Sequence, residues 1–153
     1  MRAVVTRVKN ASVEIGGKVN GQIGQGFLVL LGGGPADTAA QAERLADKVC
    51  GLRVFEDENG KMNLNLEAVG GSLLVISQFT LYADTRSRRP GFTGAAKPDV
   101  AVTLYERFMD ACRERGFAVE HGEFGADMQV FSQNDGPATI LLDTDAMQGA
   151  GGS

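Results

Sequence analysis

The sequence predicts a single α+β domain, in which a mixed or antiparallel sheet forms a barrel-like layer with two main helices. Three observations lead to this prediction. Short segments are apolar in the alternating or unbroken patterns of strands, two longer segments carry apolar residues at helical spacing, and the elements follow one another as strands, helix, strands, helix, strands. A chain of 153 residues is enough for one hydrophobic core.

Strands are predicted in the first third of the chain. Residues 11–15 alternate between apolar and polar side chains, and Gly16-Gly17 follows them as a hairpin turn. Residues 27–31 form an unbroken apolar run, which indicates a strand that is buried on both faces. A helix over residues 38–50 follows, because Thr38 and Gln41 match a capping box before a helical stripe of Ala42, Leu45, Ala46 and Val49.

The middle of the chain predicts two further strands. Residues 52–55 indicate a short strand, and residues 57–60 indicate a turn. Residues 73–76 are entirely apolar and predict a second buried strand. The loop after it, residues 85–98, contains no acidic residue and carries four cations, so it is the best candidate for a phosphate contact: Arg86, Arg88, Arg89 and Lys97.

A second helix is predicted to begin at Pro98 and to end before Gly116 at its C′ position. One face of this helix carries Val102, Tyr105, Met109 and Cys112. Strand patterns resume at residues 117–120, and the last core elements are expected at residues 128–131 and 139–142. The folded domain is therefore expected to cover residues 1–143, with a disordered tail of small and polar residues over 144–153.

Composition favours a soluble, cytoplasmic protein. No apolar stretch is long enough to cross a bilayer, and the first residues do not resemble a signal peptide. The net charge of −4 argues against non-specific coating of nucleic acid, so any phosphate contact must be local. Cys50 and Cys112 are interpreted as reduced core thiols, because neither belongs to a Cys-x-x-Cys motif.

The common catalytic motifs are missing from this sequence. The chain has no Gly-x-Ser-x-Gly elbow, no His-Glu-x-x-His motif, no phosphate-binding loop and a single histidine, His121, which is interpreted as a surface or structural residue. No metal site and no cofactor are expected, since carboxylates without histidine or paired cysteine are poor ligands for zinc.

Two segments remain as candidates for chemistry, and both are expected at junctions between a loop and a strand. Residues 77–81 (Ser-Gln-Phe-Thr-Leu) follow a buried strand, where free main-chain amides can stabilise an oxyanion while hydroxyls orient an ester. Residues 134–139 (Asn-Asp-Gly-Pro-Ala-Thr) form a turn whose Gly-Pro bond can be cis. Each segment alone is also compatible with an ordinary strand end or turn.

Together, these two segments resemble the signature motifs of the D-aminoacyl-tRNA deacylase family. The resemblance runs from residue 1 to about residue 143 and includes residues 1–8, 55–57, 60–64, 82–86 and 124–130. It implies hydrolysis of the ester in D-aminoacyl-tRNA, and of glycine mischarged on alanine tRNA, without a cofactor, a metal or an obligatory protein partner. A ribose hydroxyl of the terminal nucleotide is expected to help activate water.

The resemblance also implies a homodimer and a set of site residues. Gly136 and Pro137, joined by a cis bond, would enter the partner's site and reject L-amino acids, with Arg7 and Asn134 supporting them. The catalytic segment would comprise Ser77, Gln78, Phe79 and Thr80, with the amides of Phe79 and Thr80 as oxyanion donors. The end of the tRNA would contact Phe124, Met128, Arg86, Arg88 and Arg89.

Three alternatives stay open at this point. A cofactor-free esterase would use Thr80 or Ser77 as a nucleophile and would not depend on RNA. A non-catalytic module would bind the tRNA end through the basic loop. A related deacylase with a trans Gly136-Pro137 bond would act on tRNA mischarged with an L-amino acid.

Overall fold

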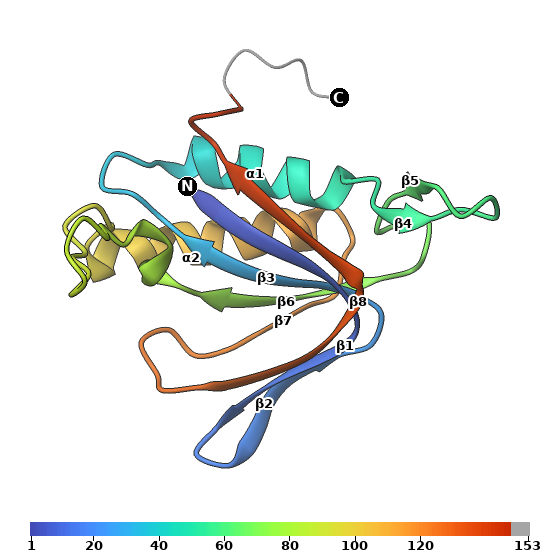
Figure 1. The fold of residues 1–153 in the computed structure, drawn as a ribbon, viewed down its shortest axis with the longest axis horizontal. Helices are drawn as coiled ribbons and strands as arrows, with labels where there is room; N and C mark the ends of the chain where they lie inside the picture. The colour runs from blue at the N-terminus through green and yellow to red at the C-terminus, as the bar shows by residue number, and fades with distance from the viewer. Residues whose placement is uncertain (148–153) are drawn as a thin grey trace.

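The computed structural model describes residues 1–147, which form one curved sheet with two helices packed on the same side of it (Figure 1). The helices are α1 (Ala39–Gly51) and α2 (Pro98–Glu114), and a short 3-10 helix, η1 (Phe79–Tyr82), lies between them in the chain. The strands are β1 (Arg2–Ile15), β2 (Lys18–Ile23), β3 (Gly26–Gly32), β4 (Phe55–Glu56), β5 (Met62–Leu64), β6 (Ser72–Ser77), β7 (Val119–His121) and β8 (Gln129–Asp143). No described helix is long and apolar enough to cross a membrane.

The long strand β1 organises the sheet. Its first half pairs with β3 and its second half with β2, both antiparallel, while its other edge pairs with β8 along most of its length. Beyond β3 the sheet continues through β6 and β7, which are both parallel to their neighbours. The sheet is therefore mixed, as the sequence predicts.

The sheet curls until its two end strands nearly meet. The Nδ2 atom of Asn20 in β2 donates to the carbonyl oxygen of His121 in β7 at 2.7 Å. Gly21 allows this approach, because a Cβ atom at that position would lie 2.9 Å from the same carbonyl oxygen. The predicted barrel-like α+β domain with two main helices is thus confirmed.

Each face of the sheet buries its own apolar cluster. Phe27 and Val29 of β3 face the helices, whereas Leu28 faces the inside of the curl. On β6, Leu73 and Leu74 divide between the same two clusters. Side chains on a strand alternate between its faces, so the unbroken apolar runs arise because both faces are covered.

Replacing Phe108 with alanine is expected to destabilise the domain by about 3–5 kcal/mol, because its ring is completely buried in the core cluster on the helix side of the sheet. Urea unfolding, with the midpoint and the m-value measured, tests this. Val19→Ala is the matched control, since Val19 is an exposed apolar residue of β2 and its truncation is expected to cost less than about 0.5 kcal/mol. Equal effects of the two substitutions would contradict the location of the core.

Local signals in the sequence are confirmed at the turns and helix ends. Gly16 and Gly17 have φ angles of 59° and 79° and connect β1 to β2. The main-chain amide of Thr38 donates to Oε1 of Gln41 at 2.7 Å, which is one half of the predicted capping box. Gly116, with φ 91°, follows α2 as expected for a C′ glycine.

The short strand expected over residues 52–55 is wrong in its position. Residues 52–54 are outside any strand, and β4 comprises only Phe55 and Glu56. The Nε atom of Arg53 donates to the carbonyl oxygen of Asn63 at 2.9 Å, so a side chain and not a strand ladder connects this segment to its neighbour. The adjoining turn over residues 57–60 is confirmed, because Oδ1 of Asp57 accepts from the amides of Asn59 and Lys61.

The two last core elements form one strand, contrary to the prediction. Residues 129–131 and 139–142 lie towards the two ends of β8, which pairs with β1 on both sides of an irregular stretch at residues 135–138. The strand is an edge and is largely exposed, and Leu141 is 77% accessible. The segment 134–139 is therefore a distorted part of a strand and not a loop before one.

The end of the described chain also differs from the expected tail. Thr144 and Met147 are buried, and the amide of Thr144 donates to the carbonyl oxygen of Met1 at 2.9 Å. The rest of the expected tail, residues 148–153, lies outside the described residues. Cys50 and Cys112 are buried free thiols, and their mutual hydrogen bond and burial raise the pKa of Cys112.

Candidate functional site

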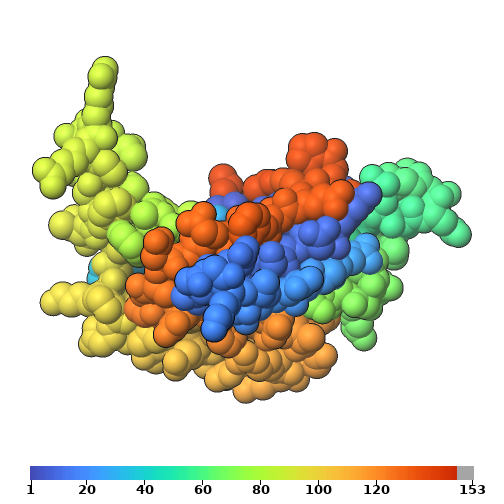
Figure 2. All heavy atoms as spheres, turned by 90° about the horizontal axis from the view of Figure 1, so that it is seen from below, coloured from blue at the N-terminus to red at the C-terminus, as the bar shows by residue number. Residues whose placement is uncertain are grey.

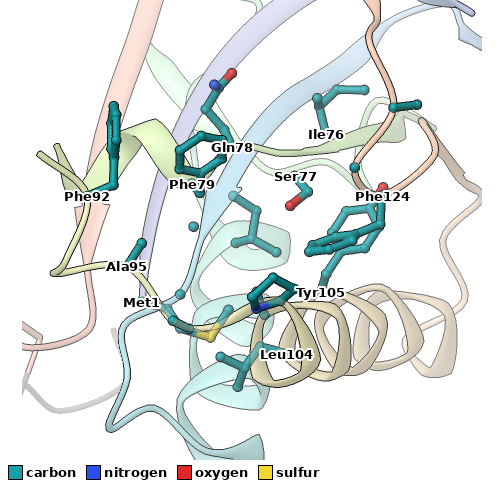
Figure 3. A pocket seen from close by; sticks show the side chains of 18 of the residues that line it. Met1, Ile76, Ser77, Gln78, Phe79, Phe92, Ala95, Leu104, Tyr105 and Phe124 are labelled. Atoms are coloured by element: carbon teal, nitrogen blue, oxygen red, sulfur yellow. The ribbon is translucent and has the colours of Figure 1, made fainter. Parts of the chain in front are cut away.

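A cavity of about 560 Å³ opens where β3 and β6 end, between η1 and α2 (Figure 3). This volume is typical of sites for small molecules, at about 300–1,000 Å³. Of the residues expected to act chemically, Ser77, Gln78 and Phe79 line it, and so do Phe124 and Met128, which were expected near the tRNA end. The Ser77 hydroxyl points into the cavity (Figure 3).

The junction between β6 and η1 presents two free amides beside this cavity. The amide of Gln78 donates to the carbonyl oxygen of Leu31 at 2.7 Å and anchors the start of the turn. Further along, the amides of Leu81 and Ala83 donate to the carbonyl oxygens of Gln78 and Thr80, whereas within residues 1–147 the amides of Phe79 and Thr80 donate to no protein acceptor. The first amides of a helical turn lack intrahelical partners and are available to an anionic oxygen.

The side chain of Gln78 restrains the hydroxyl of Thr80. Nε2 of Gln78 donates to Oγ1 of Thr80 at 2.6 Å, so the Thr80 oxygen serves as an acceptor. Thr80 itself is exposed and is not among the residues that line the cavity. The Thr80 amide therefore lies at the β6–η1 junction, while the Thr80 side chain is not part of the cavity wall.

Aromatic rings form opposite walls of the cavity. Phe79 and Phe92 meet edge to face, with ring centroids 5.0 Å apart, and Phe124 lies 6.3 Å from Tyr105 (Figure 3). The Tyr105 hydroxyl donates to the carbonyl oxygen of Val75 at 2.8 Å. Burial raises the pKa of Tyr105, so the phenol stays protonated and keeps this bond. Such walls suit a flat, largely apolar ring such as a nucleobase.

The Gly136–Pro137 peptide bond is cis and lies within β8, where Arg7 holds the preceding residue. Arg7 is 5% exposed, and its guanidinium donates to the carbonyl oxygens of Asp135 (Nε, 2.9 Å) and Val54 (Nη1, 2.5 Å). Gly136 has φ 132°, and a Cβ atom there would lie 2.7 Å from Nη2 of Arg7. Only glycine fits this conformation without displacing the arginine.

Asn134 holds the C-terminal end of the Gly-Pro segment. Its Oδ1 atom accepts from the amide of Ala138 at 3.0 Å, and its Nδ2 atom donates to Oγ1 of Thr139 at 3.2 Å. The Gly-Pro pair is thus held between two side chains, while Pro137 itself stays exposed.

The two motifs do not meet within one chain. On β1, Arg7 contacts the segment of the Gly-Pro pair, whereas Arg2, five residues earlier, contacts η1. Five residues of a strand span roughly 16 Å. None of the described residues 134–139 lines the cavity. A single protomer therefore presents the cavity and the Gly-Pro pair at separate places.

The basic loop projects from the body of the protein (Figure 2, yellow-green). Arg86 is paired with Asp84, at 2.6 Å between Nη2 and Oδ2, and this contact lowers the pKa of Asp84. Arg88 and Arg89 are exposed further along the loop. None of the three arginines lines the cavity, so their expected contact with the tRNA end is separate from the enclosed site.

Much of the cavity was not recognisable from the sequence. Many of its other walls come from segments without a polar signature, among them Met1, Leu31, Gly32, Gly33, Phe92, Ala95, Ala96 and Leu104. The Gly-rich stretch after β3 was the one usable signal, since Gly33 lies against Leu104 and a Cβ atom there would be 2.6 Å from its Cδ1.

The fold and the site define a small α+β protein that combines a cavity with aromatic walls, a pair of free amides and an exposed Gly-Pro pair held by Arg7 and Asn134. The model of the family described as D-Tyr-tRNA(Tyr) deacylase matches residues 4–143. The chain therefore belongs to this family.

Relatives and solved structures agree with this assignment. The chain is 55% identical to a D-aminoacyl-tRNA deacylase of Thermosipho africanus, over 94% of this chain and 97% of the relative. It is 57% identical to the deacylase of the same name from Shewanella sp., over 93% and 99% of the two chains.

A solved structure titled as a c-Myc DNA unwinding element binding protein superposes with a TM-score of 0.88 at 40% identity, covering 94% of this chain and 98% of the other. A second, titled as a probable eukaryotic D-amino acid tRNA deacylase, has a TM-score of 0.80 at 16% identity, over 92% and 97%, and shows the shared fold.

Proposed function

We propose that this protein hydrolyses the ester bond of D-aminoacyl-tRNA, and that it also releases glycine mischarged on alanine tRNA. The observation that carries the proposal is the pair of free amides at Phe79 and Thr80, beside a cavity with aromatic walls. The relatives named D-aminoacyl-tRNA deacylase, at 54–57% identity over nearly the whole chain, support the same activity.

In this reaction the cavity holds the terminal adenosine of the tRNA, between the rings of Phe79 and Phe124. The ester then lies at the β6–η1 junction, where the amides of Phe79 and Thr80 stabilise the oxyanion that forms on the carbonyl oxygen. Ser77 and Gln78 orient the amino acid. A ribose hydroxyl of the terminal nucleotide assists the attacking water, and the protein contributes position and charge stabilisation without a metal.

The Gly-Pro pair of a second protomer completes the site. It is exposed and held by Arg7 and Asn134, yet it lies apart from the cavity of its own chain. The exposed apolar residues Val130, Phe131 and Leu141 lie on the same edge strand, β8, and offer a surface for a homodimer. Once inserted, Gly136 and Pro137 exclude an L side chain by steric clash, while a D side chain points away and glycine has none.

The basic loop contributes affinity for the rest of the tRNA. Arg88 and Arg89 are exposed and reach away from the cavity, where they can contact backbone phosphates. Arg86 is already paired with Asp84 and is expected to shape the loop more than to bind. The proposed enzyme is soluble and acts on tRNA in the cytoplasm.

Hydrolysis of matched D- and L-tyrosyl-tRNA tests the proposal. We expect the D ester to be released at least about 100-fold faster than the L ester, because displacement of the reacting group by about 1 Å costs that much in rate. Glycyl-tRNA charged on alanine tRNA is the second substrate, and sedimentation at the assay concentration reports the dimer. Equal release of both enantiomers, or an active monomer, would contradict the cross-subunit filter.

The same assay separates the alternatives. An esterase that acts through Thr80 or Ser77 would cleave D-tyrosine ethyl ester as fast as the tRNA ester and would leave a covalent acyl-enzyme. A binding module would retain the charged tRNA without release. A deacylase for L-mischarged tRNA would prefer the L ester.

A further inference from the structure

Arg2 connects the start of β1 to the helix that carries the catalytic amides. We propose that Arg2 is a positioning residue for the deacylation site: it fixes the C-terminal end of η1 and so sets the direction of the amides of Phe79 and Thr80. This inference rests on the proposed function, which assigns those amides to the ester oxygen.

The guanidinium of Arg2 makes three contacts, two of them with η1. Its Nη1 atom donates to the carbonyl oxygen of Leu81 at 2.9 Å. Its Cζ atom lies 4.4 Å from the centroid of the Tyr82 ring, which is a cation–π distance. Its Nε atom donates to Oδ2 of Asp143, at the end of β8, at 3.1 Å. One side chain therefore joins the first strand, the last strand and η1.

The helix η1 depends on such contacts because the hydrophobic core does not hold it. It has four residues, none of them buried. At its start, the amide of Gln78 is bonded to the carbonyl oxygen of Leu31. At its end, Leu81 and Tyr82 are the residues that Arg2 holds. A cation that donates to the last carbonyls of a helical turn stabilises that turn, so loss of Arg2 removes a restraint on the C-terminal end of η1.

Global stability does not account for this arrangement. Arg2 and Asp143 are 45% and 32% exposed, and an ion pair in such a position adds little to the stability of a fold. The consequence of the contact is local to η1. Arg7, on the same strand, holds the Gly-Pro segment in a comparable way, so β1 positions both motifs through one arginine each.

Three variants test the proposal in the full-length protein. Arg2→Met keeps the apolar stem and removes the guanidinium, Arg2→Lys restores a charge and a donor, and Asp143→Asn removes only the ion pair. We expect Arg2→Met to lower kcat for D-tyrosyl-tRNA roughly tenfold, because the amides of Phe79 and Thr80 are then less precisely directed at the oxyanion. KM and the melting temperature are expected to stay close to those of the wild type.

Two further readouts separate positioning from a structural role. Arg2→Lys should recover part of the lost kcat, and Asp143→Asn should retain the wild-type kcat. The 15N–1H shifts of the Phe79 and Thr80 amides should move in Arg2→Met and stay in place in Asp143→Asn.

An unchanged kcat in Arg2→Met, or an equal loss in Asp143→Asn, would overturn the role of Arg2 while leaving the proposed function intact. If the wild-type protein hydrolyses no D-aminoacyl-tRNA, the proposed function fails, and the amide shifts alone then decide whether Arg2 positions η1. Shifts that do not move in Arg2→Met would overturn that positioning as well.

Discussion

Replacing Gly136 with alanine is expected to slow the hydrolysis of D-tyrosyl-tRNA by about 100-fold, the effect of displacing a positioning group by about 1 Å. The new Cβ atom would lie 2.7 Å from Nη2 of Arg7 and 3.1 Å from the amide of Ala138, at a φ angle of 132° that L-residues rarely adopt. Since Arg7 is buried and bonded to two carbonyls, the Gly-Pro segment has to move instead.

Single-turnover deacylation with excess enzyme measures this effect without contributions from product release. Gly24→Ala is the matched control, because a Cβ atom there meets nothing within 4 Å and its φ angle is ordinary. Sedimentation of the variant must show the same oligomeric state as the wild type. A Gly136→Ala enzyme that keeps the wild-type rate would exclude the Gly-Pro pair from the active site.

Replacing Phe79 with proline is expected to lower kcat by about 10²–10³-fold relative to Phe79→Ala, because one oxyanion donor is removed. Both variants lose the ring that faces Phe92, but only proline also loses the main-chain N–H. Proline is compatible with the first position of a helical turn, and Gln78 before it has φ −142° and ψ 83°, outside the helical region that proline disfavours. Among residues 1–147 the Phe79 amide has no protein acceptor, so no hydrogen bond of the described structure is broken.

The comparison of these two variants isolates the amide from the ring. Phe79→Ala alone is expected to raise KM, since the proposed function assigns the ring to the terminal adenosine. The loss specific to proline should fall on kcat. Should Phe79→Pro and Phe79→Ala share the same kcat, the Phe79 amide would not be an oxyanion donor, and the amide of Thr80 would have to act alone.

The sequence predicted those parts of the fold that depend on local chemistry. Three such features depend only on residues a few positions away in the chain. They are the turn at Gly16 and Gly17, the capping pair Thr38 and Gln41, and the C′ glycine Gly116. The buried strands were predictable because a short apolar run bounded by turn residues indicates a strand covered on both faces. For β8 the sequence located the two ends of the strand but not their union into one exposed edge strand, because pairing with β1 holds residues whose pattern does not indicate a strand.

The two candidate motifs were also predictable only in part. The sequence alone determined which residue types are present: a strand-end Ser77-Gln78-Phe79-Thr80 segment, a Gly136-Pro137 pair, and Arg7. Only the tertiary structure decided that the cavity draws its walls from the ends of β3 and β6, from η1 and α2, and from the loops before α2 and β8, and that the Gly-Pro pair lies away from it. The physical reason is that a cavity and the separation of two motifs are properties of packing between distant segments, whereas turns, caps and apolar runs are fixed by neighbouring residues.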